Sequence, residues 1–152
     1  ADSAQVYAHL PILSAQPSAT EMGTAPHKLF GYLDGRDTCS AARWAQDAKT
    51  EIEQAWREER LPLLVGGTGL YLRTLLYGIA PIPEINPEKR RVVRSLPTDA
   101  AYQALQGEDA ASAAALSPSD DSRVKRALEV IRSTGTSIID WRKRLEGGIA
   151  DK

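Results

Sequence analysis

The segment RLPLLVGGTGLYLRTLL, residues 60–76, constrains the fold more than any other part of the chain. Its first half is a short apolar run, Leu61 to Val65, of the kind that forms a strand covered on both faces in a parallel sheet. After the glycines, leucines and a tyrosine recur at helical spacing through Leu76. The pattern therefore predicts a strand, a glycine loop and a helix, with the loop at the carboxyl end of the strand.

The loop itself, Gly66-Gly67-Thr68-Gly69, has two interpretations. Backbone N–H groups at the start of a helix attract anions, and glycines allow a ligand to approach the backbone closely. Alternatively, the glycines form a tight turn that needs a positive φ. The loop is not a phosphate-binding P-loop, because the pattern GxxxxGK[ST] requires a lysine and a hydroxyl residue that this segment lacks. The residues alone leave both interpretations open.

Length and composition indicate one soluble globular domain with a hydrophobic core. The chain has 152 residues, of which 42% are hydrophobic and 26% are charged. The lone cysteine, Cys39, excludes an internal disulfide and a zinc site made of cysteines. No apolar run approaches the roughly 18 residues of a membrane span, and no signal peptide opens the chain. We therefore expect a cytoplasmic protein that has no membrane segment. Separately, we expect the protein to be a monomer.

Charge is distributed unevenly, although the net charge is only −1. Residues 95–121 contain five acidic residues and no basic one, whereas residues 123–144 contain seven basic residues and two acidic ones. A local basic face on a nearly neutral protein suits a partner with a confined negative surface, such as an RNA loop. The alternative is that the basic run is simply the solvated face of a helix.

The periodicity divides the chain into two parts. An extended lead, Ala4 to Tyr7, and a loop over residues 10–26 precede a helix that Ser40 can cap and that continues to about Glu58. Three prolines between Ile79 and Pro87 then predict a linker. Short helices are expected beyond it, over residues 87–96, 99–106 and 110–116, from an Asp120 or Asp121 cap to near Gly135, and through Trp141. An α/β part thus gives way to a helical part.

Three motifs, ADSAQVY, LPLLVGGTGLYL and SRVKRALEVIRSTG, together resemble the bacterial tRNA dimethylallyltransferases (tRNA isopentenyltransferases), and they occur in that family's order. The resemblance implies an α/β fold, with a P-loop NTPase-like parallel-sheet core and an α-helical insertion domain. Residues 1–80 would then form part of the core and residues 81–145 the insertion, for which an end at residue 119 is the alternative. Residues 146–152 would begin the return to the core.

The activity implied by the resemblance is transfer of a dimethylallyl group from dimethylallyl diphosphate to the N6 amine of the adenosine on the 3′ side of the anticodon in tRNA. An aromatic amine is a poor nucleophile, so a carboxylate that accepts its proton would help the reaction. Asp2 matches the family's residue in that role. The ordinary interpretation of Asp2 alone is a carboxylate that accepts backbone hydrogen bonds.

The resemblance also implies which residues face the substrates. Gly66, Gly67, Thr68 and Gly69 would line the channel where the two substrates meet. The residues expected against the tRNA anticodon stem-loop are Asp2, Ser3, Ala4, Gln5, Gly69, Arg91, Ser122, Arg123, Val124, Lys125 and Arg126. Many relatives have glutamine where this chain has Ser122. Arg123 and Arg126 are three residues apart, so they share a helix face and could hold phosphate.

The family's nucleotide-binding phosphate loop, of the ATP-binding type, is expected upstream of Ala1, and basic residues of the returning core are expected downstream of Lys152. The resemblance implies Mg²⁺ as cofactor, although these residues contain no complete site for it. We predict that the 152-residue segment alone is inactive, because its sheet would lack the central strand. Two other functions remain open: an adenylate isopentenyltransferase that acts on free AMP, ADP or ATP, and a non-catalytic RNA-binding module.

Overall fold

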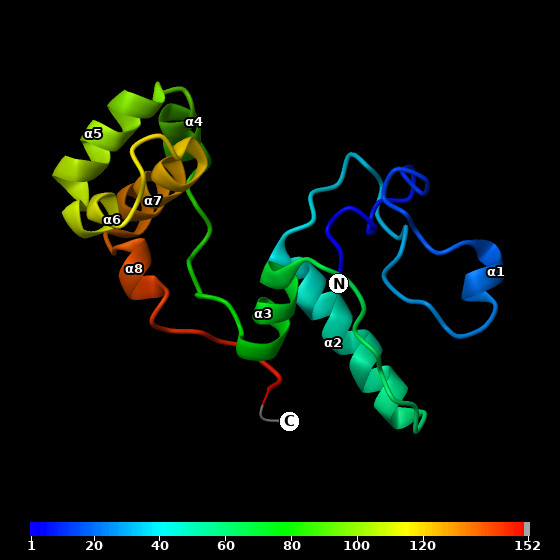
Figure 1. The fold of residues 1–152 in the computed structure, drawn as a ribbon. Coiled ribbons are helices and arrows are strands. Elements are labelled where there is room, and N and C mark those ends of the chain that lie inside the picture. Colours follow the sequence, from blue (N-terminus) through cyan, green and yellow to red (C-terminus); the bar gives the residue numbers. More distant parts are fainter. Residues whose placement is uncertain (151–152) are drawn as a thin grey trace. The chain divides into compact units, whose positions relative to one another are not determined.

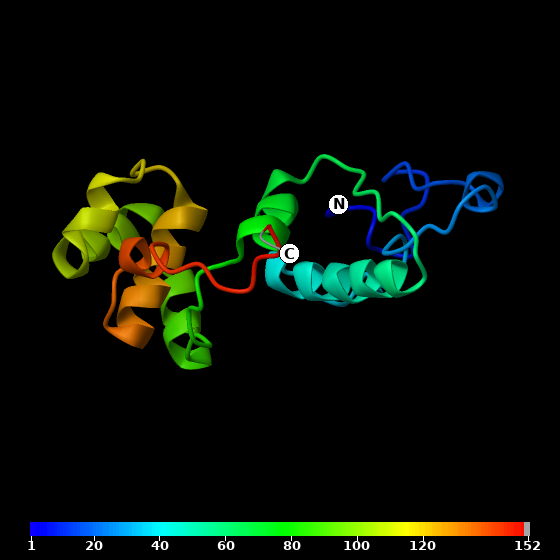
Figure 2. The same cartoon turned by 90° about the horizontal axis from the view of Figure 1, so that it is seen from below.

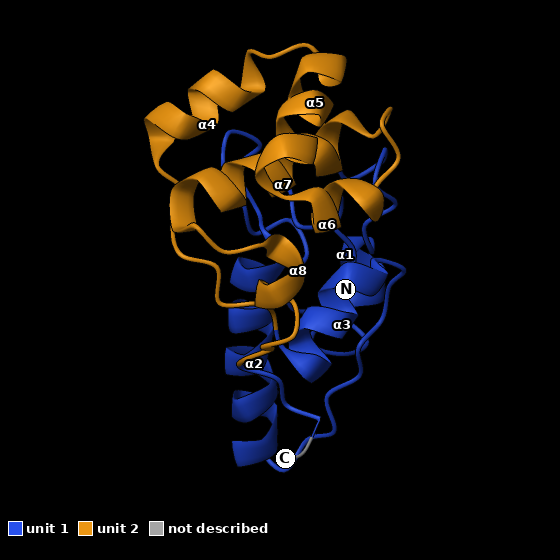
Figure 3. Cartoon of the chain, turned by 90° about the vertical axis from the view of Figure 1, so that its left-hand side faces the viewer, with its two compact units in different colours: residues 1–78, 147–152 blue, residues 79–146 orange. Residues whose placement is uncertain are grey.

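The computed structural model describes residues 1–150, and these form two compact units. Unit 1 contains Ala1–Gly78 and the segment that begins at Gly147, and unit 2 contains Ile79–Glu146 (Figure 3). The helices of unit 1 are α1 (Ala19–Met22), α2 (Ala41–Arg57) and α3 (Gly69–Tyr77). Those of unit 2 are α4 (Pro87–Arg94), α5 (Thr98–Glu108), α6 (Ala110–Ala114), α7 (Asp121–Thr134) and α8 (Ile138–Trp141) (Figure 1). Residues 151 and 152, expected within the return to the core, lie outside the described residues.

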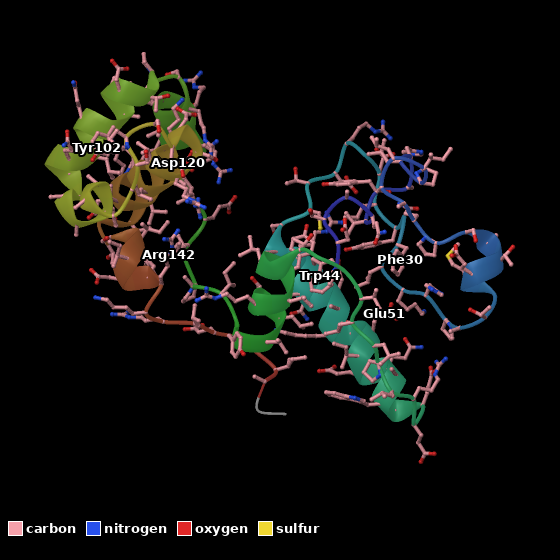
Figure 4. The ribbon with its side chains drawn as sticks, in the orientation of Figure 1. Phe30, Trp44, Glu51, Tyr102, Asp120 and Arg142 are labelled. Atoms are coloured by element: carbon pink, nitrogen blue, oxygen red, sulfur yellow. The ribbon has the colours of Figure 1, made fainter. Side chains whose placement is uncertain are left out.

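The core of unit 1 is built where α2 packs on α3 (Figures 1 and 2). The Ser40 hydroxyl caps α2 by accepting a hydrogen bond from the Arg43 N–H at 3.1 Å, which confirms the expected helix start. The apolar face of α2 buries Trp44, which Figure 4 labels on this helix. The Trp44 ring stacks on that of Tyr71 in α3, with ring centroids 5.0 Å apart. This contact fixes the direction in which α3 leaves the glycine loop.

The predicted parallel sheet is absent from the described residues. Residues 1–150 contain no strand, and their two β-bridges are isolated pairs, Tyr7 with Leu33 and Ile79 with Glu146. The apolar segment Leu61–Val65 has no helical hydrogen bonds, but no ladder forms along it. The sequence pattern identifies a segment suited to a strand, whereas a sheet also needs neighbouring strands, which residues 1–150 do not supply.

Without such neighbours, the apolar side chains of this segment are left open. The exposed fractions of Leu61, Leu63 and Val65 are 82%, 77% and 68%. Residues 61–65 and the α2 side chains Trp44 and Ile52 are part of the lining of a cavity of about 770 Å³ within unit 1. The prediction that this run is covered on both faces is therefore wrong for the described residues.

Unit 2 is a helical bundle centred on α7, against which α4 and α5 pack. Asp120, labelled in Figure 4, caps α7 by accepting a hydrogen bond from the Arg123 N–H at 3.1 Å. Gly135 ends the helix with a φ of 70°, the left-handed conformation that glycine adopts most easily. The buried side chains of this bundle are Ile85, Val93, Ala101, Leu105, Ala113, Val124, Ala127, Leu128, Val130 and Ile138. Both expected ends of this helix are confirmed.

The chain enters and leaves unit 2 at one point. Ile79 and Glu146 pair in an antiparallel bridge, with N···O distances of 3.0 and 3.1 Å in the two directions. The linker that the prolines predicted, Ile79 to Pro87, is non-helical up to Asn86, whose side chain caps α4. Among the described residues, no helix is both long and apolar enough to cross a membrane.

Candidate functional site

The amino-terminal residues lie directly against the glycine loop. The Ala1 nitrogen donates a hydrogen bond to the Val65 carbonyl at 2.6 Å, and the Thr68 N–H donates one to the Ala1 carbonyl at 3.0 Å. The Thr68 hydroxyl accepts a hydrogen bond from the Ser3 N–H at 2.9 Å. Thr68 precedes α3 but makes no side-chain cap, because its hydroxyl bonds to Ser3 instead. Two motifs 65 residues apart in sequence therefore form one structure.

The glycines of this loop have different structural roles. A Cβ at Gly66 would lie 2.5 Å from the Ala1 carbonyl oxygen, and Gly66 has a φ of +138°. Close approach and backbone conformation therefore both require glycine there. At Gly67 and Gly69, an added Cβ would meet nothing within 4 Å. Among the described residues, nothing in the packing explains these two glycines, which leaves this face of the loop open to a ligand.

Asp2 sits between the two residues that contact the loop, and it organises a turn. Its Oδ1 accepts hydrogen bonds from the N–H groups of Ala4, at 2.8 Å, and Gln5, at 3.2 Å. Residues 3–6 accordingly form turns, so the extended lead expected over residues 4–7 is wrong up to residue 6, whereas Tyr7 forms a β-bridge with Leu33. The second carboxylate oxygen, Oδ2, accepts no hydrogen bond from the described part of the chain. Asp2 thus has the ordinary backbone-bonding role and still has one oxygen available for a proton.

Tyr71 adds a neutral phenol close to Asp2. Burial is the main cause that raises the pKa of Tyr71 above its usual value, and the neighbouring Cys39 thiol and the Asp2 charge raise it further. The Tyr71 ring is buried and keeps its proton at neutral pH. Sequence reasoning counted Tyr71 only as a member of the apolar face of α3, because periodicity carries no information about the phenol oxygen.

In unit 2, the segment expected to contact RNA forms the first turns of α7. Ser122 and Arg123 are exposed. Val124 is fully buried in the bundle, and Lys125 is 9% exposed, with Nζ 2.8 Å from Asp121 Oδ1. Ser122 and Arg123 can therefore reach a ligand directly. Val124 and the ion pair of Lys125 with Asp121 hold in place the helix that carries Ser122 and Arg123.

The arginines of this region fall into two groups. Arg91 lies on α4 with its side chain 77% exposed and pairs with Glu88 at 2.6 Å. Arg126 on α7 faces the buried Glu129, with 3.6 Å between Nη1 and Oε2. Arg94 of α4 also contacts Glu129, and sequence reasoning missed both Arg94 and Glu129. The sequence contains only one sign of this ion pairing, namely that Glu129 follows Arg126 by three residues. The contact from Arg94 depends on how α4 packs on α7, which the sequence does not show.

The sequence profile of the IPP transferase family matches residues 5–149. The chain belongs to the IPP transferase family. It is 57% identical over 152 residues to the tRNA dimethylallyltransferase of Sphingopyxis alaskensis, covering 100% of this chain and 50% of that relative. The corresponding enzyme of Erythrobacter litoralis is 55% identical over 152 residues, with 100% of this chain and 48% of the relative covered. The chain thus spans about half the length of the curated relatives it matches.

Solved structures give the same family. A eukaryotic dimethylallyltransferase acting on tRNA matches with a TM-score of 0.80 and 26% identity, over 96% of this chain and 37% of the other. A tRNA isopentenylpyrophosphate transferase from Bacillus halodurans matches with a TM-score of 0.51 and 34% identity, over 89% of this chain and 46% of the other. The resemblance to this enzyme family is therefore confirmed.

The IPP transferase resemblance implies Mg²⁺, and the described residues do not fit such a site. Within residues 1–150, no group of three or more histidine, cysteine or acidic side chains could hold a metal ion. Mg²⁺ prefers several oxygen ligands at nearly octahedral geometry, which one carboxylate such as Asp2 does not provide. Among the described residues, the groups that could act on a substrate are the Asp2 carboxylate, the open backbone of Gly67 and Gly69, and the arginines of unit 2.

Proposed function

We propose that the protein to which this chain belongs transfers a dimethylallyl group from dimethylallyl diphosphate to N6 of the adenosine adjacent to the tRNA anticodon on its 3′ side. Nitrogen N6 forms a bond to C1 of the dimethylallyl group while the bond from C1 to the diphosphate oxygen breaks. The electron pair of that bond leaves with diphosphate, and N6 loses one proton. In this proposal, Asp2 is the general base that accepts the proton.

The observation that carries this proposal is the direct contact between the Asp2 turn and the glycine loop in a chain of the IPP transferase family. The Asp2 carboxylate has an oxygen without a hydrogen bond from the described residues. Gly67 and Gly69, on either side of the Thr68 that bonds to Ser3, present open backbone. Flat substrates need such room, because a purine taken out of its stack must approach the backbone closely. Gly66, Gly67, Thr68 and Gly69 accordingly form the channel wall in this proposal.

Anticodon loops suit this reaction because their bases are already largely unpaired and can be splayed out. The proposal assigns RNA contact in unit 1 to Asp2, Ser3, Ala4, Gln5 and Gly69. In unit 2 it assigns direct phosphate contact to the exposed side chains of α4 and α7, whose members are Arg91, Ser122, Arg123 and Arg126. Val124 and Lys125 support this surface from within the bundle. For the whole protein, we propose a parallel-sheet core of the P-loop type, a cytoplasmic location and a monomeric state.

The test uses the full-length protein with labelled dimethylallyl diphosphate and three acceptors: an anticodon stem-loop, the same stem-loop with guanosine at the target position, and AMP. The proposal requires label on the first acceptor only, at N6 of adenosine. Label on AMP instead would identify an adenylate isopentenyltransferase. Binding of the stem-loop with no transfer to any acceptor would identify a non-catalytic RNA-binding protein.

The channel is tested by replacing Gly67 with alanine in the full-length protein. We expect the free energy of unfolding to change by less than about 0.5 kcal/mol, since an added Cβ meets open space. The value of kcat/KM is expected to fall by about tenfold to a hundredfold, because a methyl group displaces the reacting groups from their alignment. Denaturant unfolding and steady-state kinetics measure the two effects.

Gly35→Ala is the matched control, because Gly35 lies in an exposed turn of the same unit and its added Cβ also meets nothing within 4 Å. That variant is expected to keep the wild-type kcat/KM. If Gly67→Ala is as active as Gly35→Ala, the loop does not line the channel.

A further inference from the structure

Glu129 is a fully buried carboxylate on α7, the helix that also carries the proposed RNA contacts Ser122, Arg123 and Arg126. Its side chain is 0% exposed and is one of the largest fully buried side chains of the described residues, although the bundle around it is apolar. A carboxylate removed from water needs charged or hydrogen-bonding partners, because its burial is strongly unfavourable without them. The partners of Glu129 are therefore the first question about this residue.

Three arginines from two helices face this carboxylate. Arg94 of α4 donates a hydrogen bond from Nε to Glu129 Oε1 at 2.5 Å. Arg90, one turn earlier on α4, has its Nε 3.9 Å from Oε2, and Arg126 on α7 has its Nη1 3.6 Å from the same oxygen. The hydrogen bond to Glu129 raises the pKa of Arg94 above its usual value. We call Arg90, Arg94 and Arg126 the arginine cluster.

The arginine cluster is only partly neutralised. Three positive charges face one negative charge, so an excess of two remains. The side chains of Arg90, Arg94 and Arg126 are 53%, 51% and 37% exposed, whereas the carboxylate beneath them is inaccessible. A guanidinium group has five N–H donors, and a single carboxylate uses only one or two of them. The outward donors are therefore available to an anion that arrives from solvent.

One oxygen of Glu129 is held in place without a hydrogen bond. Oε2 is buried, and it has no hydrogen-bond partner among the described residues, although two arginines lie within ion-pair distance of it. By contrast, the neighbouring Arg91 pairs with the exposed Glu88 and does not face Glu129. Of the consecutive Arg90 and Arg91, only the first belongs to the arginine cluster.

We propose that Glu129 is a positioning residue, which holds Arg90, Arg94 and Arg126 together as one preformed binding site for an RNA backbone phosphate. This inference rests on the proposed function and deepens it by naming the site at which unit 2 binds the RNA. Fixing long side chains before binding removes the entropic cost of ordering them when the ligand arrives. Planar guanidinium forks also match phosphate geometry better than ammonium groups do.

The test is Glu129→Gln in the full-length protein, assayed below its melting temperature. Removing a negative charge makes unit 2 more positive, so simple electrostatics predicts tighter RNA binding. A positioning role predicts the opposite: we expect the Kd of the anticodon stem-loop to rise about tenfold, because the arginines lose their common anchor. The KM for RNA should rise similarly with little change in kcat, since the lost interaction is present before and during the reaction.

Salt dependence gives a readout that a purely structural role does not change. With a disordered arginine cluster, the slope of log K against log salt concentration should become shallower by about 0.7–0.9, the value of one phosphate contact. Glu108→Gln is the matched control, because the Glu108 carboxylate pairs with a single arginine, Arg132, at 2.6 Å outside the arginine cluster. That variant is expected to retain the wild-type Kd and slope.

A second variant keeps the proposal falsifiable if Glu129→Gln fails to fold. Arg94→Lys preserves the charge of a half-exposed side chain and removes only the fork, and we expect it to weaken stem-loop binding about threefold to tenfold. Wild-type affinity in Arg94→Lys, or tighter binding in Glu129→Gln, overturns the positioning role. If the wild-type protein neither binds nor modifies the stem-loop, the proposed function itself fails, and that outcome is distinct from both.

Discussion

Replacing Asp2 by asparagine in the full-length protein is expected to lower kcat for dimethylallyl transfer by about 10²- to 10⁴-fold, the usual range for a general base. The amide oxygen of asparagine can still accept the N–H groups of Ala4 and Gln5, which are 2.8 and 3.2 Å from Asp2 Oδ1. The turn should therefore survive, while the oxygen that would take the proton from N6 is lost. Single-turnover kinetics with a saturating stem-loop measures the chemical step directly.

The control for this variant is Asp34→Asn. Asp34 likewise accepts a backbone N–H two residues further on, from Arg36 at 2.9 Å, but it lies outside the proposed site. Its pKa is lowered to about 2 by hydrogen bonds from Arg36, so it is ionised at neutral pH like an ordinary carboxylate. We expect wild-type kcat from Asp34→Asn. Equal, small losses in the two variants would mean that Asp2 acts only by bonding to the backbone.

The helices of this chain could be predicted because their signals are local. Ser40 and Asp120 cap their helices through their own side chains, and Gly135 ends α7 in a left-handed conformation. The sheet could not be obtained in this way, since a strand is stable only beside another strand. The run Leu61–Val65 has the composition of a buried strand but has no ladder in residues 1–150.

The candidate site was predictable where a motif carries its own chemistry. The DSAQ stretch and the glycine loop were both assigned to the substrate site from their motifs, and in the structure Ala1, Ser3 and Thr68 join the two stretches by hydrogen bonds. Their assigned roles toward tRNA stay predictions. Glu129 was not recognised because a glutamate on a basic helix is typical of a solvated face. Only the packing of α4 on α7 places Arg94 beside it and shows that the carboxylate is buried.

Gly66→Ala is expected to lower the free energy of unfolding of the full-length protein by about 2–4 kcal/mol, the combined cost of an unfavourable φ and of overpacking against backbone. A Cβ at this position would lie 2.5 Å from the Ala1 carbonyl oxygen and 2.6 Å from the carbonyl carbon, and neither atom can move aside as a flexible side chain would. Relief of this clash would shift Ala1, and with it the adjoining Asp2, away from the loop. We therefore expect transfer activity to fall even at temperatures where the variant is folded.

Gly107→Ala is the control, and its free energy of unfolding is expected to rise instead of fall. Gly107 lies within α5, and an added Cβ meets nothing within 4 Å there, so alanine should increase stability by about 0.5 kcal/mol through its higher helix propensity. Chemical denaturation of both variants, together with kcat at 25 °C, separates the effects of clash and of helix propensity. If Gly66→Ala unfolds at the wild-type denaturant concentration and retains wild-type kcat, the contact between the Asp2 turn and the glycine loop is not needed for the active site, and the site proposed for unit 1 would have to be abandoned.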